Sequence, residues 1–442
     1  MTAPTDSARS KSEALYDRAQ KVLPGGVSRN TVLRDPHPIY ADYGKGARVT
    51  DIEGVTRLDF SNNMASLIHG HAHPVVVEAV AEQLKKGTAF MMATEAEVRF
   101  AEHLCSRNRG FERIRFLNSG TEAVMSSLKA ARAFTGRPKV AKVEGAYHGL
   151  YDYAEVSQTA TPANWGDYER PASVPVAQGT PLRALADVVV IPFNDPKTAI
   201  TILNRHADEI ACVLLDVLPH RVGLVPATPD FVGALREWTL ANGALLVYDE
   251  VITFRSEYGG AQEWFEVRPD LSAMGKIIGG GFPVGALAGR EEVMDVMNPR
   301  AGELRFPHSG TFSANPITMT AGRVTMELFD RAAVARVNGL ADRARRGIDE
   351  AILRTAVPAC VTGAGSFLRV HMKADPPAHY RDVFLSPAEG ARLRALLDHL
   401  FEEGFVVINT CSMTISTPMI DRDIDDLVEA METGFSKIKT MV

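Results

Sequence analysis

The chain has 442 residues, of which 45% are hydrophobic and 23% are charged, so it can bury a large core and form more than one globular unit. A formal net charge of -6 gives no general attraction to phosphate backbones or anionic lipids, which argues against nucleic acid and membrane partners. The N-terminus is polar, no segment is apolar enough to span a bilayer, and the four cysteines form no CxxC pair, so we expect a reduced, cytoplasmic protein.

Short apolar runs alternate with helical patterns along the chain, which is typical of an α/β fold with a mainly parallel sheet covered by helices. Segment 47–61, ARVTDIEGVTRLDFS, predicts a hairpin. Strands are predicted at 113–119, 138–145, 187–193, 211–218 and 244–250. Helices are predicted at 74–86, 121–135, 229–241 and 317–328. Residues 159–181 are rich in proline, alanine and glycine, and predict a long loop that is a candidate lid.

The pattern of elements suggests how the domains are organised. Residues 61–320 hold the alternating strands and helices and are expected to form the large domain. After about residue 320 the chain becomes richer in helices. The N-terminal segment 1–60 and the C-terminal segment 321–442 are therefore expected to form a smaller α+β domain together.

Three predicted strands end in residues that can bind a ligand, and open α/β sheets bind ligands beyond these carboxyl ends. Ser119, Gly120 and Thr121 stand at the start of a helix, where free N–H groups, the helix dipole and hydroxyls suit a phosphate. An ordinary helix cap gives the same pattern. Tyr147 and His148 lie between two glycines, where an aromatic ring could stack on a flat ligand or pack on a neighbour.

The third strand, ALLVYDE, is so apolar that Asp249 and Glu250 at its end are expected to be partly desolvated. Such a carboxylate needs a partner, and an arginine or a backbone amide would be a purely structural one. Lys276 follows in MGKIIGGGFPVG, before three consecutive glycines. A nucleotide-binding loop is excluded there, because Asp270 replaces the first glycine of that motif and Ile277 replaces its Ser or Thr.

A phosphate cradle, a stacking ring, a buried carboxylate and a lysine beside small residues together fit pyridoxal 5'-phosphate. The lysine would form a Schiff base with its aldehyde, and the aspartate would keep the pyridine nitrogen protonated. Lys276 and Asp249 are therefore the predicted catalytic residues.

Ordered motifs over nearly the whole chain resemble one family, the class III (fold type I) pyridoxal-phosphate aminotransferases. The resemblance is to the branch of glutamate-1-semialdehyde aminomutase and the β-amino-acid and ω-aminotransferases. The motifs are LPGGVSRN, HGHAHPVVVEAV, NSGTEAV, EGAYHG, YDEVITFR, PDLSAMGKIIGGGFPVGA and HSGTFSANPITMTAG.

The resemblance implies a role for each matched residue. Lys276 would be the Schiff-base lysine and Asp249 the pyridine partner, with Val251 packed beneath the ring and Tyr147 stacked above it. Gly120 and Thr121 would hold the phosphate. Gly310 and Thr311 would reach that phosphate from the partner subunit of a homodimer.

The family reaction implied is a two-stage exchange in which an amine or amino-acid donor gives its amino group to a carbonyl acceptor. Arg29 matches a stretch that supplies a carboxylate-binding arginine in relatives, although an exposed surface charge would look the same. Met64 occupies the aromatic position of the aminomutases. Two further candidates for binding a carboxylate are Arg221 and Arg369. The replacement of that aromatic residue by Met64 is a departure from the aminomutases. It favours an intermolecular aminotransferase, with the intramolecular aminomutase as the alternative.

Two other functional classes were weighed. His69, His71 and His73 would align for zinc on a strand, but the glycine, alanine and proline around them predict a turn, so we expect no metal. A non-catalytic sensor that keeps the cofactor fold is disfavoured by the retained Lys276 and Asp249.

Overall fold

The computed structural model of the protein describes residues 10–441, and its largest element is a seven-stranded sheet in the order β4-β12-β11-β10-β9-β5-β8. All neighbouring pairs run parallel except those of β12, which is antiparallel to both β11 and β4. The strands are β4 (Arg113–Leu117), β5 (Lys139–Val143), β8 (Val188–Ile191), β9 (Ile210–Leu215), β10 (Leu245–Asp249), β11 (Leu271–Gly275) and β12 (Gly285–Gly289). This confirms the predicted α/β class.

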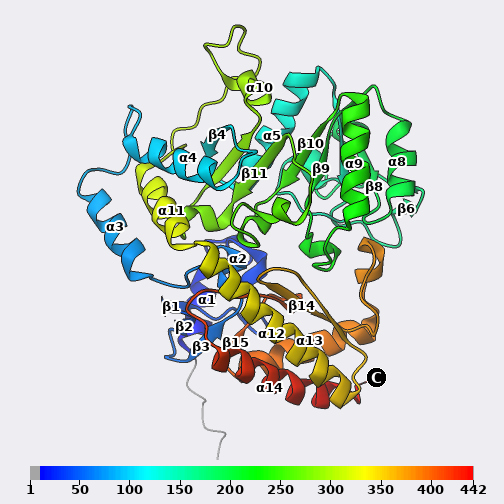
Figure 1. The fold of residues 1–442 in the computed structure, drawn as a ribbon. Coiled ribbons are helices and arrows are strands. Elements are labelled where there is room, and N and C mark those ends of the chain that lie inside the picture. Colours follow the sequence, from blue (N-terminus) through cyan, green and yellow to red (C-terminus); the bar gives the residue numbers. More distant parts are fainter. Residues whose placement is uncertain (1–9, 442) are drawn as a thin grey trace, which may run out of the picture.

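Helices and loops cover both faces of this sheet, so most of its strand residues are buried and apolar. On β9, Val213 and Leu215 pack on one face, whereas Leu214 packs on the other. Helices α8 (Pro196–Asn204) and α9 (Pro229–Asn242) lie together beside β8 and β9 (Figure 1), and α5 (Gly120–Thr135) contributes Val124 and Leu128 to the core that contains Leu214.

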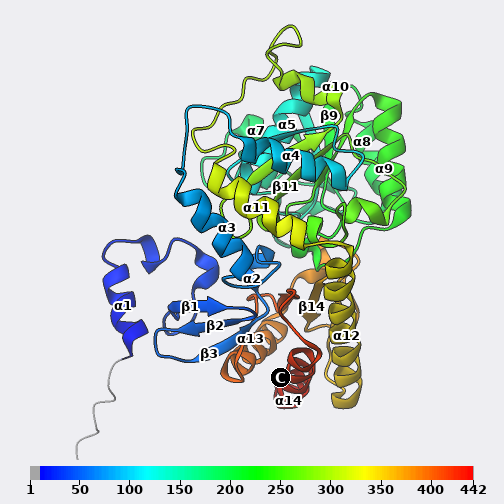
Figure 2. The same ribbon diagram turned by 60° about the vertical axis from the view of Figure 1, so that its left-hand side comes forward.

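A second unit is built from the two ends of the chain. Strands β1 (Ala41–Lys45), β2 (Arg48–Asp51), β3 (Thr56–Asp59) and β15 (Phe405–Val406) form a four-stranded sheet in that order. Strands β13 (Cys360–Thr362), β14 (Phe367–His371) and β16 (Ser412–Thr414) form a three-stranded sheet. Figure 2 shows these sheets with α12 (Arg331–Thr355), α13 (Pro387–Glu402) and α14 (Asp421–Ile438) below the large sheet. The exact division at 1–60, 61–320 and 321–442 stays a prediction.

The remaining α-helices and strands are shorter or lie outside these sheets, and α1 lies beside β1–β3 (Figure 2). They are α1 (Lys11–Ala19), α2 (Asn62–Ala65), α3 (Pro74–Leu84), α4 (Glu95–Arg107), α6 (Asp152–Glu155), α7 (Leu182–Ala186), α10 (Glu291–Met294), α11 (Pro316–Leu328), β6 (Gly166–Asp167) and β7 (Arg170–Pro171). Among the helices of residues 10–441, none has the length and apolarity needed to cross a bilayer.

The predicted strands and helices are confirmed, most of them to within two residues at each end. The hairpin predicted at 47–61 is β2–β3. The sequence analysis missed β11 and β12, because LSAMG and GALAG consist largely of small residues with little preference for strands. Residues 159–181 form the predicted long loop, which contains the short pair β6–β7. Its role as a lid stays a prediction.

Candidate active site

The start of α5, the end of β10 and the end of β11 meet at one point. A Cβ atom built on Gly120 would lie 2.8 Å from Val251 Cγ1, and one built on Gly275 would lie 3.4 Å from the Cα of Gly120. The close approach of α5 to Val251 therefore requires glycine at position 120, whereas a Cβ at position 275 would make ordinary van der Waals contacts. Since Gly275 precedes Lys276 and Val251 follows soon after Asp249, the contact brings the predicted catalytic residues to the first turn of α5.

The first turn of α5 is capped in a way that leaves its leading N–H groups free. Ser119 Oγ accepts a hydrogen bond from the Glu122 N–H at 3.1 Å, so the helix-cap interpretation of this serine is confirmed. The N–H groups of Gly120 and Thr121 come earlier in the helix and have no acceptor within it. The loop that follows β5 closes over this turn, because a Cβ on Gly149 would meet Thr121 Oγ1 at 2.5 Å.

Asp249 is held by a histidine and a backbone amide. Its Oδ2 lies 2.7 Å from His148 Nδ1, and its Oδ1 accepts the Val251 N–H at 3.0 Å. The sequence analysis anticipated an arginine or an amide, and it had placed His148 only as a neighbour of Tyr147. Burial lowers the pKa of His148, while its hydrogen bond to Asp249 opposes that shift. The His148 Nε2 atom is buried and has no hydrogen-bond partner among residues 10–441.

Lys276 lies where burial disfavours its charged form. Burial lowers the pKa of its amine, and the negative charges of Asp249 and Asp216 partly oppose this. Asp216 is itself buried, and burial followed by the nearby charge of Asp249 raises its pKa well above the usual range for a carboxyl. Asp216 is thus disposed to be neutral.

Tyr147 is half-buried on the loop after β5, next to His220. The two ring centres are 5.7 Å apart in an edge-to-face arrangement, and the Arg221 guanidinium lies 5.9 Å from the centre of the tyrosine ring. Arg221 donates to the Gln158 carbonyl, and buried Arg369 donates to the His220 carbonyl at 2.8 Å. Both candidate carboxylate-binding arginines thus hold backbone of the loops around Tyr147.

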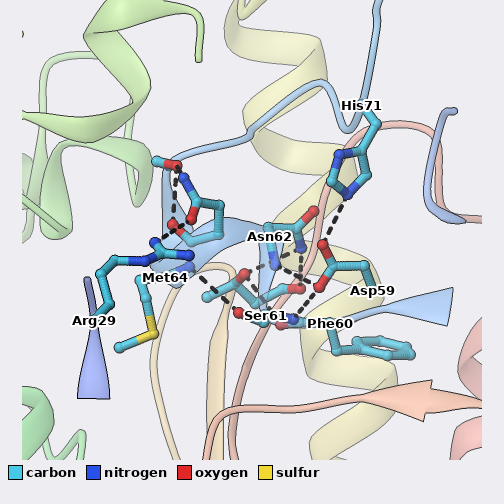
Figure 3. A network of polar contacts seen from close by, with 10 residues as sticks. Arg29, Asp59, Phe60, Ser61, Asn62, Met64 and His71 are labelled. Carbon is cyan, nitrogen blue, oxygen red and sulfur yellow. Dashed lines mark hydrogen bonds and ion pairs between the residues drawn. The ribbon is translucent and has the colours of Figure 1, made fainter. Parts of the chain in front are cut away.

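Arg29 and Met64 are brought together at α2. The exposed Arg29 reaches from the N-terminal segment and donates through Nη1 to Asn63 Oδ1 at 2.8 Å, beside Met64 (Figure 3). Ser61 Oγ accepts the Met64 N–H at 3.3 Å, and Asn62 Nδ2 donates to the Thr414 carbonyl at 2.9 Å. Two residues that are distant in sequence therefore occupy the same corner of the molecule.

Gly310 and Thr311 lie on an exposed loop. None of the contacts found within residues 10–441 joins them to Ser119, Gly120 or Thr121. Thr311 instead lines a small recess of about 50 Å³ together with Phe90 and Met92.

Of the three histidines before α3, His69 and His71 are hydrogen-bonded as predicted, whereas the buried His73 Nδ1 has no hydrogen-bond partner among residues 10–441. His69 bridges Thr417 Oγ1 and the Thr325 carbonyl at 2.8 and 3.0 Å, and His71 Nε2 lies 2.8 Å from Asp59 Oδ2. His73 precedes the first residue of α3. Within residues 10–441, no group of three or more His, Cys, Asp or Glu side chains is arranged to hold a metal.

The residues present fit pyridoxal 5'-phosphate. The first turn of α5 offers unpaired N–H groups to a phosphate, the Asp249 carboxyl lies at the end of a buried strand, and burial disposes the Lys276 amine to be neutral. An open α/β sheet with these groups at neighbouring strand ends defines a fold type I pyridoxal-phosphate enzyme.

Comparison with known proteins gives the family. Residues 31–434 match the model of aminotransferase class-III, and the chain belongs to that family of pyridoxal-phosphate enzymes. A solved ω-transaminase from Sphaerobacter thermophilus is 45% identical, with 98% of each chain covered and a TM-score of 0.95. A β-phenylalanine aminotransferase from Variovorax paradoxus is 32% identical, with 96% and 93% covered and a TM-score of 0.85. A glutamate-1-semialdehyde 2,1-aminomutase from Methanothermobacter thermautotrophicus is 38% identical over 84% of this chain and 86% of its own.

Proposed function

We propose that this enzyme is an intermolecular aminotransferase of the ω-transaminase type. It moves an amino group from an amine or a β-amino acid to a keto acid or aldehyde in two half-reactions. The observation that carries this proposal is Lys276, a half-buried lysine whose pKa is lowered by burial and which has no ion-pair partner among residues 10–441. Such an amine can accept a proton from a substrate carbon and return it.

We assign the roles of the cofactor site from its geometry. Pyridoxal phosphate, when bound, supplies a ring that accepts electrons from the substrate. The N–H groups of Gly120 and Thr121 bind its phosphate, and Ser119 supports them by capping α5. Asp249 presents a fixed anionic acceptor to the ring nitrogen, oriented by its hydrogen bonds from His148 and Val251.

The side chains of Val251 and Tyr147 bracket the ring. Val251 presses against Gly120 below it, and Tyr147 is placed above it by a loop that packs on Thr121. Lys276 Nζ moves the proton between the substrate carbon and the cofactor.

Arg29 is the proposed anchor for the substrate carboxylate, with Met64 as the apolar wall beside it. The guanidinium is exposed, and its one hydrogen bond given by the structure goes to the neutral Asn63, so donors of its planar fork remain for a carboxylate. The Variovorax relative, described as a β-phenylalanine aminotransferase, supports a substrate of this class.

We further propose a homodimer in which Gly310 and Thr311 complete the phosphate site of the partner subunit. Large apolar side chains near this loop are exposed, with Phe312 at 60%, Met92 at 83% and Phe90 at 51%. Residues 90, 92 and 311 line the same recess, so these side chains form one apolar patch that a second copy would cover. The cytoplasm is the proposed location, in keeping with four free thiols.

The second candidate function is an intramolecular aminomutase, which the Methanothermobacter relative favours. The higher identity to the Sphaerobacter ω-transaminase favours the aminotransferase. The test is turnover of single amino donors with and without pyruvate. We expect bleaching of the visible cofactor band by the donor alone and continued turnover only with the acceptor. Sustained conversion of one substrate without any acceptor would establish the mutase instead.

Borohydride reduction of the cofactor-loaded enzyme, followed by peptide mapping, tests the catalytic assignment separately. The pyridoxyl group is expected on Lys276. A label on any other lysine would refute the assignment.

A further inference from the structure

Lys142 is a lysine with 0% exposure in the middle of the large unit, on strand β5. Its Nζ donates to three backbone carbonyls, those of Val143, Ala146 and Val156, at 3.2, 3.0 and 2.7 Å. No carboxylate pairs with it within the part of the chain that the structure describes. All of its hydrogen bonds thus go to main-chain oxygen.

Burying a lysine without a counter-ion in the core costs desolvation free energy. Burial lowers its pKa to about 7, and the negative charge of Glu144 only partly opposes this. An apolar side chain of the same length would avoid that penalty. The ammonium has three N–H groups and three carbonyl acceptors. These hydrogen bonds explain why a lysine occupies this buried position.

These carbonyls stand at the two ends of the loop that carries Tyr147 and His148. Ala146 directly precedes Tyr147, and Val156 directly follows α6, where the chain leaves the loop. The Gly145 N–H donates to the Ser157 carbonyl at 3.0 Å, which closes the loop at the same level. The hydrogen bonds of Lys142 therefore connect the beginning of the loop to its end.

The front of the same loop faces the proposed cofactor site. His148 contacts Asp249 at 2.7 Å, and Gly149 packs on Thr121. A displacement of the backbone at Ala146 would therefore move both the Tyr147 ring and the His148 imidazole.

We propose that Lys142 is a positioning residue, whose three hydrogen bonds fix the loop of residues 144–158 so that Tyr147 and His148 face the cofactor. The effect on the loop is independent of the proposed function. The effect on cofactor binding rests on that function.

The test compares Lys142→Met, which removes all three donors, with Lys142→Gln, which keeps two. Lys139→Met is the matched control, because Lys139 is on the same strand but pairs with Glu209 near the protein surface. Hydrogen exchange of the cofactor-free protein is measured by mass spectrometry. We expect exchange in residues 144–158 about tenfold faster in Lys142→Met, intermediate in Lys142→Gln and unchanged in the control.

Cofactor titration is the second readout, and we expect about tenfold weaker binding by Lys142→Met. Unchanged exchange in 144–158, faster exchange spread evenly over the molecule, or failure of both variants to fold would overturn the proposal. So would a loosened loop with unaltered cofactor affinity. If the loop loosens but the wild-type protein binds no pyridoxal phosphate, the positioning of the loop stands and the proposed function falls.

Discussion

The contact between Gly120 and Val251 predicts that one methyl group at the start of α5 will weaken the cofactor site. In Gly120→Ala, the new Cβ would lie 2.8 Å from Val251 Cγ1 and 3.0 Å from Val251 Cγ2. Val251 is β-branched and stiff at χ1, so it cannot rotate the clash away. Gly120 lacks a positive φ, so alanine introduces no backbone strain and the whole effect is steric.

The expected magnitude follows from overpacking. One extra methyl in a tight site costs about 1–3 kcal/mol when its neighbours must move. The segments that would move carry the phosphate-binding N–H groups and Asp249. We therefore expect the dissociation constant of pyridoxal phosphate to rise about 5- to 150-fold. Titration of the cofactor-free protein, followed by the visible absorbance of the bound form, measures this.

Two further variants isolate the cause. Gly120→Ala combined with Val251→Ala removes the clashing methyl groups, so the double variant should bind the cofactor better than the sum of the single effects predicts. Gly233→Ala is the control, since a Cβ there meets nothing within 4 Å in helix α9. It should raise stability by up to about 1 kcal/mol and leave affinity unchanged. Wild-type affinity in Gly120→Ala, or additive effects in the double variant, would refute the packing described.

Two other predictions concern the substrate and pH. Arg29→Gln should raise KM about tenfold for donors that carry a carboxylate and leave KM unchanged for amines without one. Arg34→Gln is the control, because Arg34 pairs with Asp398, and it should change neither value. Equal effects of Arg29→Gln on both donor classes would contradict the assignment. Burial lowers the pKa of His69 to about 4, so the folded state favours the neutral imidazole. The unfolded state then binds more protons, and stability should fall by up to about 3 kcal/mol as pH drops from 6.5 to 4. Urea unfolding should show a flatter pH dependence in His69→Gln, and an equally steep one would contradict this.

The site could be predicted from sequence where it depends on strand ends. The apolar run of β10 places Asp249 at a carboxyl edge, and helix signals place Ser119 at the start of α5. The pairing of β10 with β11 then sets Asp249 opposite Ala273, three residues before Lys276. Parallel neighbours bring their ends to one edge, but β11 was not predicted, so Asp249 was placed by its strand pattern and Lys276 by its neighbouring glycines and the family resemblance.

Contacts between distant segments could not be predicted in the same way. The bond from His148 to Asp249 joins residues 101 positions apart, and nothing in EGAYHG distinguishes a histidine that supports a carboxylate from one that touches a ligand. The pairing of β15 with β3 likewise unites the two ends of the chain. A buried strand lysine such as Lys142 runs against the apolar pattern and reads as an edge residue in the sequence.

Backbone strain is a second property that local sequence conceals. Four consecutive residues of α2 have positive φ, namely Asn62 at 45°, Asn63 at 48°, Met64 at 58° and Ala65 at 70°. Such conformations cost about 1–2 kcal/mol each in non-glycine residues. They persist because the surroundings hold them, here through the bonds of Asn62 and Met64 described above. Strain of this kind concentrates at functional sites, and this turn carries Met64 beside Arg29.

Lys276 itself has a φ of 50°, in the left-handed region that disfavours side chains. Strand β11 ends immediately before it and a short helix, Lys276–Gly279, begins at it, so the fold sets the direction of the amine. Two replacements of the lysine therefore distinguish its role in catalysis from the backbone strain at this position. Both Lys276→Ala and Lys276→Gly should be inactive, but the glycine variant should be the more stable by about 1 kcal/mol, the reverse of the usual order. Urea unfolding of the two cofactor-free variants measures this difference, and a more stable alanine variant would show that the backbone at Lys276 is unstrained.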